Sequence, residues 1–126
     1  MAEEEIVAPL TDLYRAGKET FPRFAEMVAK ATEELGGFYD VWKGQLAEAG
    51  NPPSLVDAVA INGECYDLLR RAVIFINNGA EALVHAADEL ARSDSDAAES
   101  SITLKRLVQE PLRTPAVPAP REEDAA

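Results

Sequence analysis

Apolar residues recur at alternating steps of three and four along two long segments of this chain. That spacing places them on one face of an α-helix with heptad character. In the first segment the face consists of Phe21, Phe24, Val28, Ala31, Leu35, Phe38 and Trp42. In the second it consists of Leu55, Val59, Tyr66, Leu69, Val73, Ile76, Ala80, Leu83, Ala87 and Leu90, with polar Asn62 in the gap. The pattern predicts two long helices.

The first of these helices has clear start signals. Thr20 is a suitable N-cap, and Pro22 follows in the position where the first helical turn tolerates proline. We therefore predict a helix over residues 20–49 and a short separate turn over residues 10–16.

A break separates the two segments. Gly50 is a common helix stop, and Asn51-Pro52-Pro53 cannot continue a helix. Ser54 then resembles a new N-cap, so the second helix is predicted over residues 54–94. Asn77-Asn78-Gly79 is its weak point, but the heptad phase is unchanged across it, which favours a continuous helix.

Both segments carry a second apolar face, which a pair of helices cannot bury by itself. On the first helix this face is small, and consists of Ala25, Ala29, Thr32, Gly36 and Tyr39. On the second it includes the predicted partner-interface residues Ile61, Leu68, Ala72, Phe75, Gly79 and Ala82. Alanines alone would fit a solvated face. Ile61, Leu68 and Phe75 are too large for that reading, so they favour pairing with a second hairpin, of the same or a different protein.

Composition divides the 126 residues into three parts. Residues 1–9 are acidic, end at Pro9 and suggest a flexible leader, while residues 10–98 carry the helical patterns. The tail, residues 99–126, is predicted to hold a short helix within Ser101–Glu110. From about residue 111 it is rich in proline and acidic side chains, and we expect disorder there. The predicted fold is all-α: a long antiparallel two-helix hairpin that pairs into a four-helix bundle.

Charge and hydropathy exclude several classes of protein. A net charge of −11 repels phosphates, so the chain is not expected to bind nucleic acid. The longest strongly apolar run, residues 72–76, is far shorter than the roughly 20 residues of a spanning helix, so no membrane insertion is expected. The first five residues, Met-Ala-Glu-Glu-Glu, are acidic where a Sec signal would be basic, so any export is expected to use another route.

No catalytic, cofactor or metal site is predicted. His85 is the single histidine, and it shares a helix face with Glu81 and Glu89. A solvated histidine with a carboxylate four residues away explains this group better than metal ligands. The single cysteine, Cys65, excludes an internal disulfide and is expected to be a buried, unreactive thiol. We therefore predict a protein that is not an enzyme.

The tripeptide Trp42-Lys43-Gly44, near the end of the first helix pattern, resembles the motif of the Trp-x-Gly (WxG) family of small helical-hairpin proteins of type VII secretion. The resemblance covers residues 10–98, with Trp42 and Gly44 as its motif residues. It implies two long helices, a bend near the tripeptide, and dimerisation into a four-helix bundle. In the family the tryptophan helps to form a surface that partners and the secretion machinery engage. Trp42 is also in phase with the apolar face, so packing alone would explain it.

The family's export signal, Tyr-x-x-x-Asp/Glu after the second helix, corresponds to Leu90–Asp94, where leucine replaces the tyrosine. Residues 82–90 are also similar to signal-bearing helices of type VII substrates. The resemblance implies synthesis in the bacterial cytoplasm and secretion by the type VII route. The predicted function is that of a secreted or secretion-associated partner protein. The alternative, favoured by the missing tyrosine, is a cytosolic all-helical adaptor or chaperone-like protein that is not exported.

Overall fold

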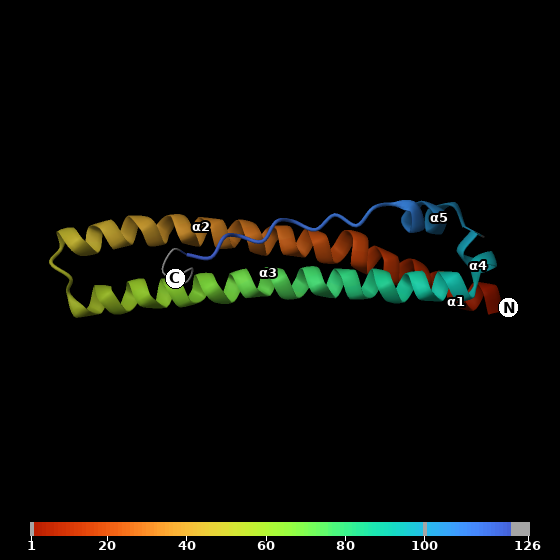
Figure 1. Cartoon of the computed structure of the whole chain (residues 1–126), viewed down its shortest axis with the longest axis horizontal. Coiled ribbons are helices and arrows are strands. Elements are labelled where there is room, and N and C mark those ends of the chain that lie inside the picture. The colour runs from red at the N-terminus through yellow and green to blue at the C-terminus, as the bar shows by residue number, and fades with distance from the viewer. Residues whose placement is uncertain (1, 100, 122–126) are drawn as a thin grey trace. The chain divides into compact units, whose positions relative to one another are not determined.

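The computed structural model describes residues 2–99 and 101–121, and every regular element in those ranges is helical (Figure 1). The elements are α1 (Ala2–Arg15), a π-helical segment η1 (Ala16–Thr20), α2 (Phe21–Glu48), α3 (Pro53–Ser93), α4 (Ser95–Glu99) and α5 (Ile102–Gln109). The all-α class is thereby confirmed for the described residues. Both long helices end within one residue of the expected positions, and α3 is continuous through Asn77 and Gly79, as predicted.

The chain divides into two compact units. The first comprises Met1–Ala25 and Phe75–Pro115, and the second comprises Glu26–Ile74 and Ala116–Ala126. The boundaries between the units fall inside α2, inside α3 and in the segment after α5.

The first unit has a core of large buried side chains. Leu10 and Tyr14 of α1 are fully buried with Leu104 and Leu107 of α5. Small residues of α3 and α4 complete the cluster, namely Ala87, Ala91 and Ala98. Residues 2–9, which we expected to form a flexible leader, therefore belong to a helix that carries core residues, and Pro9 lies inside it. The short helix predicted within Ser101–Glu110 is confirmed as α5, with Ser101 as its N-cap.

The predicted helix start at Thr20 is wrong, because the chain is already helical there. The backbone N–H of Phe21 bonds to the carbonyl of Ala16, five residues earlier. This wider turn precedes Pro22, whose ring would collide with the carbonyl four residues back in a regular α-helix. The π-helical segment thus lets the helix continue past the proline. Gly17 in this segment lies so close to α3 that a Cβ atom there would be 2.7 Å from Cγ2 of Val84.

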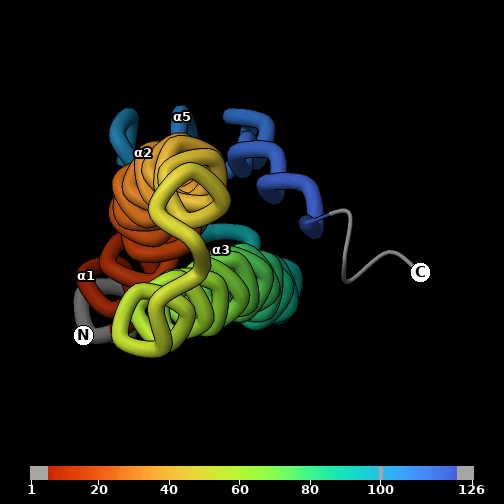
Figure 2. The backbone as a smooth tube through the Cα atoms, turned by 90° about the vertical axis from the view of Figure 1, so that its left-hand side faces the viewer, coloured from red at the N-terminus to blue at the C-terminus, as the bar shows by residue number. Residues whose placement is uncertain are grey.

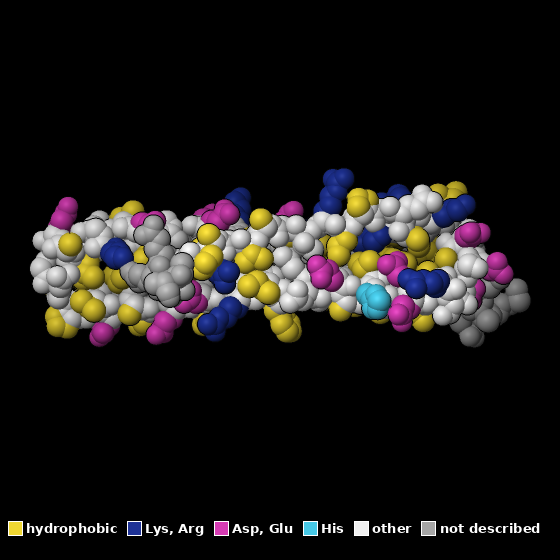
Figure 3. All heavy atoms as spheres, in the orientation of Figure 1, with side chains coloured by type: hydrophobic (Ala, Val, Ile, Leu, Met, Phe, Trp, Pro, Cys, Tyr) yellow, Lys and Arg dark blue, Asp and Glu magenta, His cyan; other side chains and the backbone are white. Residues whose placement is uncertain are grey.

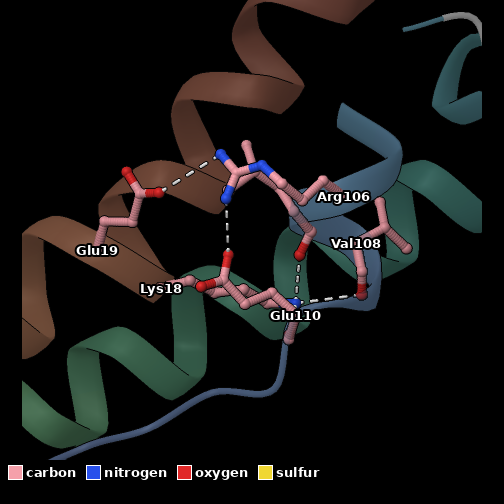
Figure 4. Close-up of polar contacts among 6 residues, drawn as sticks. Lys18, Glu19, Arg106, Val108 and Glu110 are labelled. Atoms are coloured by element: carbon pink, nitrogen blue, oxygen red, sulfur yellow. Dashed lines mark hydrogen bonds and ion pairs between the residues drawn. The ribbon is translucent and has the colours of Figure 1, made fainter. Parts of the chain in front are cut away.

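Lys18 fastens η1 to the end of α5 in the first unit. Its Nζ donates hydrogen bonds to the carbonyl oxygens of Leu107 at 2.5 Å, Val108 at 3.1 Å and Glu110 (Figure 4). The last carbonyls of a helix have no partner within the helix, and a cation there also interacts favourably with the helix dipole. Burial lowers the pKa of Lys18, while the carboxylates of Asp88 and Glu110 act in the opposite direction.

In the second unit a tight turn joins α2 to α3 (Figure 2). Gly50 has φ +82°, and its N–H bonds to the carbonyl of Ala47, while the N–H of Asn51 bonds to Leu46. This is a Schellman motif, which requires a left-handed residue that glycine adopts without strain. Gly50 ends α2 as predicted. Ser54 is not the N-cap of α3, because the helix already begins at Pro53, where proline fits the first helical position.

The core of the second unit is built mostly from small or polar side chains. Ala29, Thr32 and Tyr39 of α2 are buried, and so are Val59 and Tyr66 of α3. Gly36 brings α2 close to α3, because a Cβ atom at position 36 would be 2.9 Å from the ring of Tyr66.

Residues 111–121 are not helical, but the structure does not support the disorder expected for them. In the first unit Nδ2 of Asn77 donates to the carbonyl of Pro115 at 3.1 Å. In the second unit Pro118 is buried, and the segment 116–121 makes several polar contacts with α3. The composition suggested disorder because the segment has few large apolar residues, yet its backbone carbonyls find donors on α3. Residues 122–126 of the predicted tail lie outside the described residues.

Candidate partner interface

The second unit exposes large apolar side chains on both of its helices. Phe38, Val41 and Trp42 of α2 are exposed, as are Ile61 (59%) and Leu68 (63%) of α3. The rings of Phe38 and Trp42 also contact each other, with centroids 6.4 Å apart. Figure 3 shows hydrophobic side chains reaching the surface on the face that it presents. Large exposed apolar side chains that gather on helix faces are typical of surfaces that bind other proteins.

The exposed face of α2 is the one that the sequence pattern predicted to be buried. In the second unit α2 buries the smaller face, Ala29, Thr32 and Tyr39, and leaves Phe38 and Trp42 outside. Small side chains allow the two helices to approach closely at Gly36, as the contact with Tyr66 shows. On α3 the predicted face is buried at Val59 and Tyr66.

Of the six residues predicted as a partner interface, four are exposed and two are partly covered. Ile61 and Leu68 of the second unit are exposed, and so are Phe75 (79%) and Ala82 of the first unit. Ala72 is half-buried. Gly79 does not form part of an open surface, because a Cβ atom there would be 2.9 Å from the ring of Phe21.

The Trp-x-Gly residues lie in the second unit, on the last turns of α2. Trp42 is 42% exposed and lines a small pocket of about 170 Å³ together with apolar residues of α2 and α3, Leu46, Leu55, Ala58 and Val59, and Gln45. Gly44 is exposed, and a Cβ atom there would meet nothing within 4 Å. Packing against the described residues therefore does not require glycine at this position.

The residues that correspond to the export signal lie in the first unit. Leu90, on the last turns of α3, is 40% exposed. Asp94 follows the helix, and its Oδ1 accepts a hydrogen bond from the backbone N–H of Ala97 at 3.0 Å. Asp94 thus acts as the N-cap of α4, a structural role that the sequence pattern did not reveal.

The single histidine and the single cysteine both lie on exposed parts of α3. His85 pairs with Glu89 at 3.3 Å, and both side chains are mostly exposed, as expected. Cys65 is exposed, so its predicted burial is wrong; it lies on the outer face of α3. In residues 2–99 and 101–121 no three or more histidine, cysteine or acidic side chains gather as metal ligands.

In the first unit, the pKa of Tyr14 is strongly shifted. Its phenol O–H donates to Oδ1 of Asp88 at 2.5 Å. Burial, together with the hydrogen bond and the charge of Asp88, raises the pKa of Tyr14 well above its ordinary value. Tyr14 and Asp88 line an open pocket of about 350 Å³. This pairing holds α1 against α3.

Sequence reasoning missed a set of residues in the second unit that holds Arg121: Tyr39, Gly63 and Asp67. The available signal was the run Pro118-Ala119-Pro120-Arg121, which we interpreted only as a marker of disorder.

Among the described helices, none combines the length and apolar character needed to cross a bilayer. No protein-family model, curated protein or solved structure matches this chain.

Proposed function

We propose that this chain is a non-enzymatic helical-hairpin protein that acts by pairing with a second helical hairpin, as a partner in a type VII secretion system. In this proposal α2 and α3 form a long antiparallel hairpin, and two hairpins pair into a four-helix bundle. The supporting observation is that Ile61, Leu68 and Phe75, spaced seven residues apart on α3, are all exposed. A repeat of seven on one helix is the spacing that a partner helix would cover.

The link to type VII secretion is supported by the Trp-x-Gly resemblance and by the position of Trp42. The tryptophan lies two turns before the end of α2, beside an apolar pocket and partly exposed. A large aromatic side chain in this setting is well suited to anchor a partner, since aromatic residues dominate the energetics of many interfaces.

The test of pairing is the association state of Phe75→Glu. We expect the wild-type chain to dimerise in sedimentation equilibrium, alone or with a candidate partner hairpin protein. Phe75→Glu should raise the dissociation constant roughly 100-fold, because it buries an unpaired carboxylate in an apolar interface. The folded monomer should keep its helicity, since Phe75 is exposed there.

The matched control is Ile102→Glu. Ile102 is even more exposed than Phe75 but belongs to α5, whereas the predicted interface residues belong to α3. It should leave association unchanged. A wild-type chain that stays monomeric at high concentration with normal helicity, alone and with candidate partner hairpin proteins, would contradict the proposal.

The alternative function is a cytosolic helical adaptor that is never exported. Two observations favour it: leucine stands at position 90 where the family signal has tyrosine, and Asp94 is already engaged as the cap of α4. If the chain is exported, the amount secreted by a type VII-competent host should rise with Leu90→Tyr and fall with Asp94→Ala. If neither the wild type nor Leu90→Tyr is found in the medium, the secretion proposal fails and the cytosolic adaptor is the favoured function.

A further inference from the structure

The side chain of Arg121 is held in the second unit by Tyr39, Gly63 and Asp67. Its guanidinium lies over the ring of Tyr39, with Cζ 5.1 Å from the ring centroid, and Nη2 is 3.1 Å from Oδ2 of Asp67. Arg121 is largely buried by these contacts. A planar cation held between an aromatic face and a carboxylate is an arrangement that lysine would not reproduce.

Gly63 forms the floor of this site. A Cβ atom at position 63 would collide with Nη1 of Arg121, and the nearest atoms around that position all belong to the same guanidinium. Glycine weakens the interior of a helix, because it loses more backbone freedom on folding than other residues. At this position the absence of a side chain makes room for the arginine.

The residues before Arg121 are held through their backbone. Nε of Arg70 donates to the carbonyl of Pro118 at 2.9 Å, and the phenol of Tyr66 donates to the carbonyl of Ala119 at 2.5 Å. Prolines favour an extended conformation and leave carbonyl oxygens as the main hydrogen-bonding groups. Donors on α3 therefore match what this segment can offer.

The spacing of helix and segment also agrees. The segment runs antiparallel to α3, with Pro118 at Arg70 and Arg121 at Gly63. Seven helical residues span about 10.5 Å, and three residues of extended chain span about 9 to 10 Å. The two spans therefore agree, and Figure 1 shows the segment running along α3 in the opposite direction.

We propose that this surface is a binding site for an extended Pro-Ala-Pro-Arg peptide, and that residues 118–121 are its resident and displaceable ligand. Aromatic-lined grooves that accept proline-rich extended peptides use the same physical features, a stiff ligand and an exposed row of carbonyls. The ligand is tethered, so a free peptide competes against an effective concentration in the millimolar range. Weakening the resident segment should open the site to the same sequence on another chain.

The test uses a labelled, amidated peptide with the sequence of residues 114–121, Thr-Pro-Ala-Val-Pro-Ala-Pro-Arg, and the full-length chain. By fluorescence anisotropy the peptide should bind the Arg121→Glu chain at least tenfold more tightly than the wild type, whose own Arg121 occupies the site. Replacing the peptide's arginine with glutamate should weaken binding to the Arg121→Glu chain at least tenfold. Adding Asp67→Asn to that chain should also weaken binding of the arginine peptide, because it removes the carboxylate that pairs with the guanidinium.

A second measurement follows the resident segment itself. Trypsin should cleave after Arg121 several-fold faster in Asp67→Lys than in the wild type, because the ion pair that holds the arginine is lost. Glu64→Lys is the matched control: it makes the same charge change at an exposed neighbouring position, and should leave the rate unchanged.

Three results would overturn the proposal. The first is a peptide that fails to bind the Arg121→Glu chain, and the second is peptide binding to that chain that Asp67→Asn leaves unchanged. The third is an equal trypsin rate at Arg121 in the wild type, Asp67→Lys and Glu64→Lys.

Discussion

The two units of this chain place their large apolar side chains differently. In the first unit Leu10, Tyr14, Leu104 and Leu107 are fully buried, in a cluster drawn from helices that lie far apart in the sequence. In the second unit the largest fully buried side chains are only Val73 and Thr32, while Phe38, Ile61 and Leu68 remain exposed.

This difference separates what stabilises the chain from what is available to a partner. A core of large residues removes apolar area from water within one chain, and each fully buried leucine contributes about 1.5–3 kcal/mol. Exposed residues of the same size contribute that stabilisation only when something covers them. The second unit is therefore the better place to look for binding, and the first for stability. The first unit also has exposed large apolar residues, among them Phe24, Phe75 and Ile102.

The largest expected effect comes from Leu107→Ala, set against Leu68→Ala. Leu107 is fully buried, so its truncation should lower the free energy of unfolding by about 2–5 kcal/mol. Leu68 is 63% exposed, so the same change should alter the stability of the monomer by no more than about 0.5 kcal/mol. Urea unfolding followed by circular dichroism, at concentrations where the chain is monomeric, measures both. Equal costs would remove the distinction between the two units.

A smaller effect is expected for Tyr14→Phe, which removes the hydrogen bond to Asp88. At neutral pH the loss should be about 1–2 kcal/mol, because the hydrogen bond to the carboxyl group of Asp88 is only partly buried. The raised pKa means that the folded state holds the phenol proton more tightly than the unfolded state. This contribution is complete below the unfolded pKa near 10 and is lost as the pH rises above it.

The measurement is the difference in unfolding free energy between the wild type and Tyr14→Phe as a function of pH. The difference should be constant from pH 7 to about pH 9 and should shrink above about pH 10. Other tyrosines and lysines titrate in both proteins and cancel in the difference. A difference that stays constant to pH 11 would show that the phenol is not held protonated by the fold.

Local patterns predicted the helices and the turn well, because both depend on residues close in sequence. The spacing of apolar residues indicated α2 and α3, and Gly50 ends α2 as expected. The choice between two neighbouring faces of α2 is not a local property. It depends on which side chains let α3 approach, and Gly36 opposite Tyr66 decides it. The burial expected for Cys65 failed for a similar reason, since its face of α3 is not covered within the chain.

Contacts between distant segments were beyond the sequence pattern. Lys18 bonds to Leu107, 89 residues later, and this contact joins η1 to the short helix α5. In the candidate interface, Ile61, Leu68 and Phe75 could be named from spacing and size, whereas the site around Arg121 requires knowing where the tail lies on α3.

The smallest expected effects come from two adjacent glycines of α2 in the second unit, and they have opposite signs. Gly37→Ala adds a Cβ atom that meets nothing within 4 Å, so it should stabilise the helix by about 0.5–1 kcal/mol through its higher helix propensity. Gly36→Ala gains the same propensity but places its Cβ 2.9 Å from the Tyr66 ring. The ring is stiff and its phenol holds Ala119, so we expect a net loss of stability and faster trypsin cleavage after Arg121. Thermal unfolding and proteolysis of the two variants measure this. Stabilisation by both substitutions would show that α2 is free to move away from α3 at Gly36, and that the close approach there does not hold the second unit together.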